Sequence, residues 1–304
     1  MSTKEKCLYI LNNEQANIDI EKIFQKCYSG YGEITDKEAS IFIYYCSIYF
    51  MNKILDDNII NKTNGNIVSN KELKKGLSFN DAIAAMTTLE NSYKFEYSED
   101  LIDILKEKNI VSFYTVTSII GHEIFHIYQR QCIENNIIKL ECLIDALEFI
   151  NREQDESFYV DNYDILHFEI TAEIAGIYLS KDFIEDIINR KLSKDEYDYI
   201  KELFVNNNPK QLDRYNNDLE LIKHLNYLIS NISEYIKNNL KLLDRYPVLQ
   251  TIFNKEGNIR DIEDIVNITE ILPNIGYCTE ENIKKLYKYV LKALNYKNQK
   301  KYSL

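Results

Sequence analysis

The stretch Val111–Cys132, VSFYTVTSIIGHEIFHIYQRQC, decides the fold of this chain, because it predicts one long helix that carries an H-E-x-x-H motif. Two histidines four positions apart on a helix lie on the same face, so His122 and His126 can reach one metal ion. Glu123 is rotated by about 100° from His122, where its carboxylate can meet a water on that metal without ligating it. The spacing therefore predicts a metal centre with two histidine ligands and a separate carboxylate.

The composition predicts a mainly α protein. Eight Gly and three Pro among 304 residues, with many Leu, Ile, Lys and Glu, favour helices over loops and sheets. The alternation YKFEY at residues 93–97 is the clearest strand signal, so we expect at most a small β-sheet. We expect an N-terminal helical region at 1–77, a catalytic core at 78–190 and a C-terminal helical region at 191–304, packed as one compact unit.

Charge and apolar runs limit the partners of the chain. The net charge of -12 arises from 48 acidic and 36 basic residues spread along the sequence, so we expect no nucleic-acid partner. Residues 1–15 lack the apolar core and cleavage site of a signal peptide, and the apolar run Ile41–Met51 is too short to span a bilayer. Six cysteines without C-x-x-C spacing are expected to be reduced thiols. These features predict a cytoplasmic protein without a membrane partner.

Capping signals and periodicity place the other helices. Thr35 and Glu38 form a capping box ahead of an apolar helix that runs to about Asp57, and Ser193 and Glu196 form a second box. The remaining helices that we expect cover residues 14–28, 80–91, 99–108, 137–151, 165–188, 218–244 and 279–295.

The motif helix supplies two ligands, whereas a catalytic zinc site needs three protein ligands and one open position for water. The later segment HFEITAEIAG, residues 167–176, supplies two carboxylates four positions apart, Glu169 and Glu173. Ala172 and Gly176 in this segment are small and would let its helix approach the motif helix closely. Asp161 and His167 are further ligand candidates.

With these residues the chain resembles the gluzincin metallopeptidases, in which a ligand Glu follows H-E-x-x-H and an acid four residues later supports one histidine. The resemblance covers about residues 113–178, and HEIFHIYQ is similar to the helix of small bacterial and phage-borne peptidase-like families. It implies a zincin-like helical core with Glu169 as third ligand and Glu173 as the supporting acid. The second acid departs from the family pattern, because Asp is more frequent there.

The resemblance also implies an activity. A zinc hydrolase of this type would bind one Zn²⁺ per chain and cleave a peptide or protein substrate, with Glu123 as general base. His224 could stabilise the transition state as a His or Tyr does in related enzymes, or it could be an ordinary helix histidine. An extended substrate could pair with the edge of the strand at 93–97.

Two other classes of function remain open on the sequence alone. Glu123-x-x-His126 is also the E-x-x-H of helical di-iron proteins, and Asp164-x-x-His167 is a near match, although this reading gives His122 no role. A catalytically inactive zincin-like protein could use the same fold for binding. The motif histidines could also be ordinary core or surface residues, and the two later glutamates a solvated helix stripe.

Overall fold

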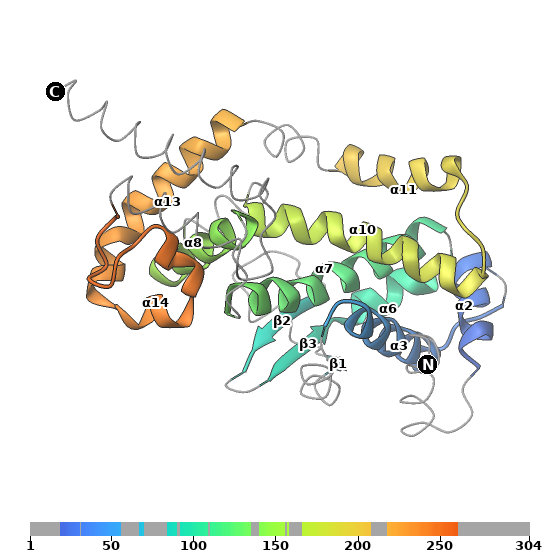
Figure 1. The fold of residues 1–304 in the computed structure, drawn as a ribbon. Coiled ribbons are helices and arrows are strands. Elements are labelled where there is room, and N and C mark those ends of the chain that lie inside the picture. The colour runs from blue at the N-terminus through green and yellow to red at the C-terminus, as the bar shows by residue number, and fades with distance from the viewer. Residues whose placement is uncertain are drawn as a thin grey trace. The chain divides into compact units, whose positions relative to one another are not determined.

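The computed structural model describes residues 19–30, 32–55, 67–69, 84–89, 92–108, 110–134, 140–155, 157, 166–207 and 218–260 (Figure 1). Most of them are helical and one small sheet is present, so the predicted mainly α fold is confirmed. Their contacts divide them into unit 1, within 1–128 and 171–207, and unit 2, within 129–170 and 208–304. The division at residues 77 and 190 stays a prediction. None of the helices in the described parts is long and apolar enough to cross a membrane.

Two helices have residues in both units, α7 (Ile110–Glu134) and α10 (His167–Ile188). The other helices of unit 1 are α2 (Ile20–Ser29), α3 (Asp36–Ile54), α6 (Glu99–Lys106) and α11 (Lys194–Asn207). Both predicted capping boxes form. The Thr35 hydroxyl accepts the Glu38 N–H at 3.2 Å, and the Ser193 hydroxyl accepts the Glu196 N–H at 3.2 Å. These short-range signals therefore set where α3 and α11 begin.

The sheet of unit 1 has the strand order β1-β3-β2. Strand β3 (Tyr93–Tyr97) is the predicted strand, with β1 (Ile67–Ser69) parallel on one side and β2 (Ala84–Thr88) antiparallel on the other. The helix predicted at residues 80–91 is therefore wrong over β2: hairpin pairing with β3 overrides the helix preference of its two alanines. Because β3 is the central strand, β1 and β2 form the outer strands of the described sheet. The expectation that a substrate pairs with an edge of β3 is therefore wrong, since both edges of β3 are already paired.

The core of unit 1 is built around α3. Its apolar run Ile41–Met51 is buried almost all round, as expected of a central helix. Phe183 of α10 packs edge-on against Tyr49 and Phe50, with ring centroids 5.1 and 5.7 Å apart. Phe113 of α7 packs against Phe42 of α3 at 5.6 Å. These aromatic contacts hold α7 and α10 against the same central helix and so place both site-bearing helices.

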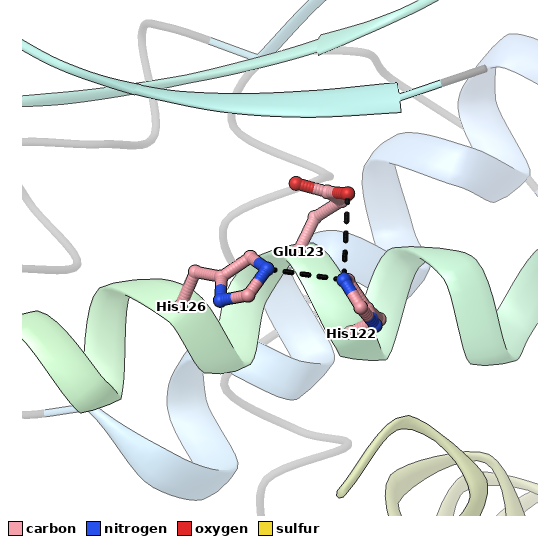
Figure 2. Close-up of side chains that lie close together, drawn as sticks. All are labelled: His122, Glu123 and His126. Atoms are coloured by element: carbon pink, nitrogen blue, oxygen red, sulfur yellow. Dashed lines mark hydrogen bonds and ion pairs between the residues drawn. The ribbon is translucent and has the colours of Figure 1, made fainter. Parts of the chain in front are cut away.

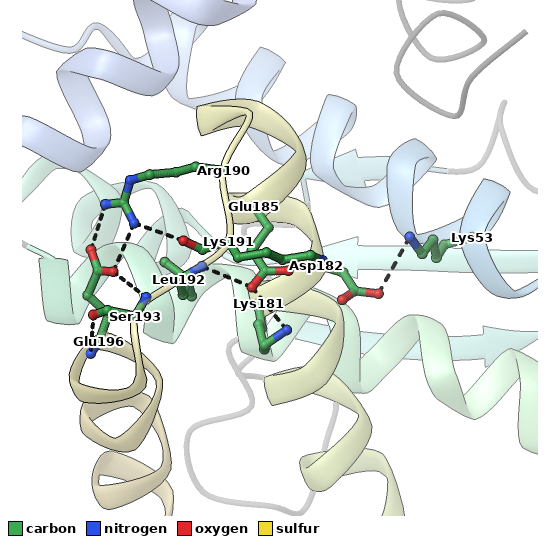
Figure 3. A network of polar contacts seen from close by, with 9 residues as sticks. All are labelled: Lys53, Lys181, Asp182, Glu185, Arg190, Lys191, Leu192, Ser193 and Glu196. Atoms are coloured by element: carbon green, nitrogen blue, oxygen red, sulfur yellow. Dashed lines mark hydrogen bonds and ion pairs between the residues drawn. The ribbon is translucent and has the colours of Figure 1, made fainter.

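A polar network closes the connection between α10 and α11 (Figure 3). The buried Glu185 carboxylate accepts Lys191 Nζ at 2.6 Å and the Leu192 N–H at 3.0 Å, and Lys181 Nζ lies 3.1 Å away. The Arg190 guanidinium donates two hydrogen bonds to the Glu196 carboxylate, from Nη2 at 2.7 Å and from Nη1 at 2.9 Å. Burial raises the pKa of Glu185, but the contacts with Lys191, Leu192 and Lys181 outweigh it and lower the pKa to about 2.

Unit 2 contains α8 (Leu140–Gln154), α13 (Asp218–Asn238), α14 (Lys241–Arg245), a 3₁₀ turn at Pro247–Thr251 and the remaining parts of α7 and α10. Helix α8 packs on α13. The helix predicted at 218–244 ends at Asn238. There the Asn239 side chain donates to the Tyr235 carbonyl, and the Asn239 N–H donates to the Ile236 carbonyl instead of continuing the α-helical pattern. The helix predicted at 279–295 lies outside the described residues.

Candidate metal centre

The motif residues lie on α7 within unit 1 (Figure 2). Ile120, Ile124 and Ile127 are buried on the apolar sides of this helix. His122 is also nearly buried, at 8% exposure, whereas Glu123 and His126 are partly exposed. The apolar residues therefore hold α7 in the core of unit 1 while its motif face keeps access to solvent.

The two imidazoles face each other through the same ring atom. Nε2 of His122 lies 3.0 Å from Nε2 of His126, and the ring planes are nearly perpendicular at 88°. Two nitrogens on one tetrahedral zinc, each at 2.0–2.1 Å, would lie about 3.3 Å apart. The arrangement therefore fits a shared ion with little movement of either ring.

Glu123 stands beside this pair. Its Oε1 lies 3.9 Å from His122 Nε2, and one ligand-type atom from each of the three residues falls within a 4.8 Å group. In Figure 2 the carboxylate points away from α7, toward the side on which strands of the sheet cross the view. Imidazole and carboxylate donors of this kind suit zinc. Among the described residues this is the one such cluster of His, Cys, Asp or Glu.

Glu173 of α10 contacts the other nitrogen of His122. His122 Nδ1 donates to Glu173 Oε2 at 3.0 Å, and both residues belong to unit 1. A ring that keeps its proton on Nδ1 presents the lone pair of Nε2, which is the form that ligates a metal. The side chain of Glu, longer than the Asp frequent in the resembled families, reaches the ring without difficulty.

Two glycines allow α7 and α10 to cross at this point. A Cβ on Gly121 would lie 3.0 Å from Gly176 Cα, and a Cβ on Gly176 would lie 3.0 Å from the His122 backbone nitrogen. Ala172, one turn before Gly176, is fully buried. The close approach expected from small residues is therefore present, and it brings Glu173 within reach of His122.

The remaining predicted residues belong to unit 2. Glu169 lies in the first turn of α10 and is 3% exposed. His224 is buried on α13, where its Nε2 donates to Glu148 Oε1 at 2.6 Å, and His167 Nδ1 donates to Asp145 Oδ1 at 2.9 Å. The roles of Glu169 as ligand and of His224 as stabiliser stay predictions. Asp161 lies outside the described residues.

Sequence reasoning missed the buried carboxylates Asp145 and Glu148 of α8. Both are only 4% exposed and lie among the buried Ile144, Ala146 and Leu147. Acids inside an apolar helix segment are unusual unless they are paired. Their position between apolar residues could therefore have indicated that both are buried and hydrogen-bonded.

Comparison of the chain with protein-family models, with curated proteins and with solved structures finds no match.

Proposed function

We propose that this chain is a zinc-dependent metallopeptidase of gluzincin type, with one Zn²⁺ held by His122 and His126; Glu169 stays the third ligand that the resemblance implies. The observation that carries the proposal is the paired Nε2 atoms of the two histidines, 3.0 Å apart, with the opposite nitrogen of His122 bound to Glu173. A direct hydrogen bond between the two rings accounts for the same distance in a chain without metal, so the metal content decides between the two interpretations. A cytoplasmic location and a peptide or protein substrate belong to the same proposal.

The choice of third ligand follows from what Glu173 already contacts. Its Oε2 accepts a hydrogen bond from His122 Nδ1, and Nδ1 and Nε2 point to different sides of the imidazole ring. A carboxylate that is hydrogen-bonded to Nδ1 fixes the orientation and the tautomer of the ring and does not bind the metal. Glu169 is the remaining acid of the pair and stays the ligand that the resemblance implies, although it does not belong to the described cluster of His122, Glu123 and His126.

The proposed chemistry assigns distinct tasks to the side chains. Bound zinc would lower the pKa of a water and polarise the substrate carbonyl. Glu123, held beside the ligands and 3.9 Å from His122 Nε2, would take the proton of the attacking water and pass it to the leaving amine. His122 and His126 would hold the centre with neutral rings. Glu173 would keep His122 in the required tautomer.

The di-iron alternative gains no support from these contacts. It gives His122 no role, whereas His122 Nε2 faces His126 Nε2. It also requires Asp164, which lies outside the described residues. His167, its other residue, donates through Nδ1 to Asp145.

Metal content of the purified protein tests the proposal directly. Elemental analysis should find about one zinc per chain in the parent and none in His122→Ala or His126→Ala, because both rings are ligands. Thr115→Ala is the matched control: Thr115 lies on the same helix, and its hydroxyl donates to the Val111 carbonyl at 2.9 Å. Full zinc in both histidine variants would remove the site. Stoichiometric zinc without hydrolysis of any peptide would favour the inactive binding protein.

A further inference from the structure

Two of the six arginines of the chain approach one buried aromatic ring in unit 2. The centroid of the fully buried Tyr246 ring lies 5.7 Å from Arg130 Cζ and 5.0 Å from Arg245 Cζ. Arg130 Cζ, on α7, also lies 4.6 Å from the ring centroid of Phe149 on α8. The two rings attract the charge of Arg130, but they supply no ordinary hydrogen-bond acceptor for its N–H groups.

The terminal nitrogens of Arg130 have no acceptor in the part of unit 2 that the structure describes. Its Nε donates to Glu134 Oε1 at 2.8 Å, one turn later on α7, whereas no described acceptor lies within hydrogen-bond distance of Nη1 or Nη2. The Arg130 side chain is nevertheless only 10% exposed. A buried N–H group without an acceptor costs stability, so a ligand that supplies acceptor oxygens would gain from binding here.

Arg245 of α14 brings a second positive charge to the same ring. Its Nη1 lies 3.6 Å from Glu153 Oε1, which is longer than a hydrogen bond, and the same Oε1 accepts the Tyr246 hydroxyl at 3.5 Å. The Arg245 side chain is 48% exposed, so solvent reaches the cluster from this side. Burial raises the pKa of the Tyr246 hydroxyl to about 12, although the charge of Arg130 opposes the shift. The hydroxyl is therefore protonated at neutral pH and can donate.

We propose that Arg130, Arg245 and the Tyr246 hydroxyl form a binding site for a carboxylate group, with Nη1 and Nη2 of Arg130 as the main donors. The edge of a guanidinium group matches the two oxygens of a carboxylate, and such charge-assisted pairs are strong hydrogen bonds. The local charge favours a monoanion, because a phosphate dianion would bring a second negative charge close to Glu134 and Glu153. All these residues belong to unit 2, and the site does not depend on the proposed zinc centre.

The direct test follows the arginine side chains by NMR in the full-length protein labelled with ¹⁵N-arginine. Six arginines give few signals, and the spectrum of Arg130→Lys identifies that of Arg130. Sodium acetate should shift the Arg130 signals and saturate, because the new hydrogen bonds form at its terminal nitrogens. Sodium chloride at the same ionic strength should not reproduce the shift. Tighter binding of inorganic phosphate than of acetate would overturn the assignment to a carboxylate.

Three variants test the donors. Arg130→Lys keeps the charge but lacks the paired N–H groups, so it should raise the acetate dissociation constant, followed by the Arg245 signals, by at least about tenfold. Arg245→Gln removes the more exposed charge and should raise it by about two- to fivefold, followed by the Arg130 signals. Arg260→Lys is the matched control in unit 2 and should bind acetate as the parent does, because Arg260 Nε already donates to the Gln250 and Phe253 carbonyls.

The outcomes decide whether the cluster is a site. Shifts that do not saturate, or equal dissociation constants in the parent and Arg130→Lys, would overturn it. If Arg130→Lys does not fold, Arg245→Gln carries the test, and a parent-like dissociation constant in that variant overturns the site. His122→Ala should bind acetate as the parent does, so a failure of the proposed zinc centre leaves this inference standing. Loss of the Arg130 shifts in His122→Ala would instead place the acetate at the metal and overturn the site.

Discussion

His122 Nδ1 and Glu173 Oε2 lie 3.0 Å apart, although the two residues are 51 positions apart in the sequence. The contact joins α7 to α10 inside unit 1, at the point where Gly121 and Gly176 let the helices meet. It fixes the His122 ring from the side opposite to the proposed metal. A residue of a second helix thus orients the His122 ring. The effect of Glu173 on zinc affinity can therefore be measured apart from the loss of a ligand.

Glu169→Ala should abolish stoichiometric zinc binding, whereas Glu173→Ala should weaken it by about 10–100-fold, because the first removes a ligand and the second removes ring support. Zinc titration of both variants checks this. The reverse order would show that the ligand assignment is wrong by one helical turn.

Glu123→Gln should keep the zinc and the melting temperature of the parent but lower kcat by at least about 10²-fold, because the amide cannot act as a general base. The measurements are elemental analysis, thermal unfolding and turnover of a peptide that the parent cleaves. Unchanged turnover would exclude Glu123 from the mechanism. Loss of zinc would instead make it a ligand.

Gly176→Ala should destabilise unit 1 by about 1–3 kcal/mol, because the added Cβ meets the Ser118 carbonyl and the His122 backbone, which cannot move aside as a side chain could. Zinc affinity should fall as well, since α10 must shift away from His122. Tyr178→Phe is the control on the same helix: the side chain is 53% exposed, the ring keeps its contact with Tyr197, and the change should alter stability by about 0.5 kcal/mol or less. Denaturant unfolding and zinc titration measure both effects. A Gly176→Ala variant as stable as the parent would mean that the crossing is looser than described.

Glu185 should make the stability of the protein fall in acid. Its pKa is lowered from an ordinary value of 4.5 to about 2 in the folded state, so its contribution is fully present above about pH 4.5 and is lost as the pH falls toward 2. Glu185→Gln should be less stable than the parent at pH 7, by on the order of 2 kcal/mol. The difference should shrink between pH 4.5 and 2. Chemical unfolding of both proteins across this range checks the sign, and a difference independent of pH would contradict it.

The acidic surplus of the chain, with Glu123 and Glu173 at the candidate centre, predicts a preference for cationic or neutral peptides over acidic ones. The preference should appear in kcat/KM and weaken with added salt, because exposed charges are screened beyond about 10 Å at 0.1 M ionic strength. A mixed peptide library profiled at two salt concentrations measures it. Selection of apolar residues with no dependence on charge would instead point to a cleft lined by Tyr and Ile.

Local signals in the sequence predicted what depends on neighbours along the chain. The capping boxes at Thr35 and Ser193, the alternating strand Tyr93–Tyr97 and the motif helix all appear where their short-range patterns place them. The spacing of His122 and His126 likewise predicted that their rings would meet, since a helix of known period determines it.

Features that depend on distant partners escaped prediction. Strand β2 forms because it pairs with β3. The sequence of the segment itself, AAMTT, does not indicate this pairing. Glu148 and Asp145 are interpretable only once the start of α10 is seen to lie against α8. Their chemistry is that of a buried acid paired across helices, which the order of residues along one helix does not reveal.

The crossing of Gly121 and Gly176 has a consequence for how this chain can vary. Any missense change at Gly176 adds at least a Cβ, and the atoms that it meets belong to the backbone, where no second substitution can make room. Position 176 therefore does not tolerate a larger residue, whereas at a core position a smaller neighbouring side chain can compensate for a larger one. A variant library of this protein, selected only for folding, should therefore retain glycine at 176 while the core around Phe183 exchanges one large apolar residue for another.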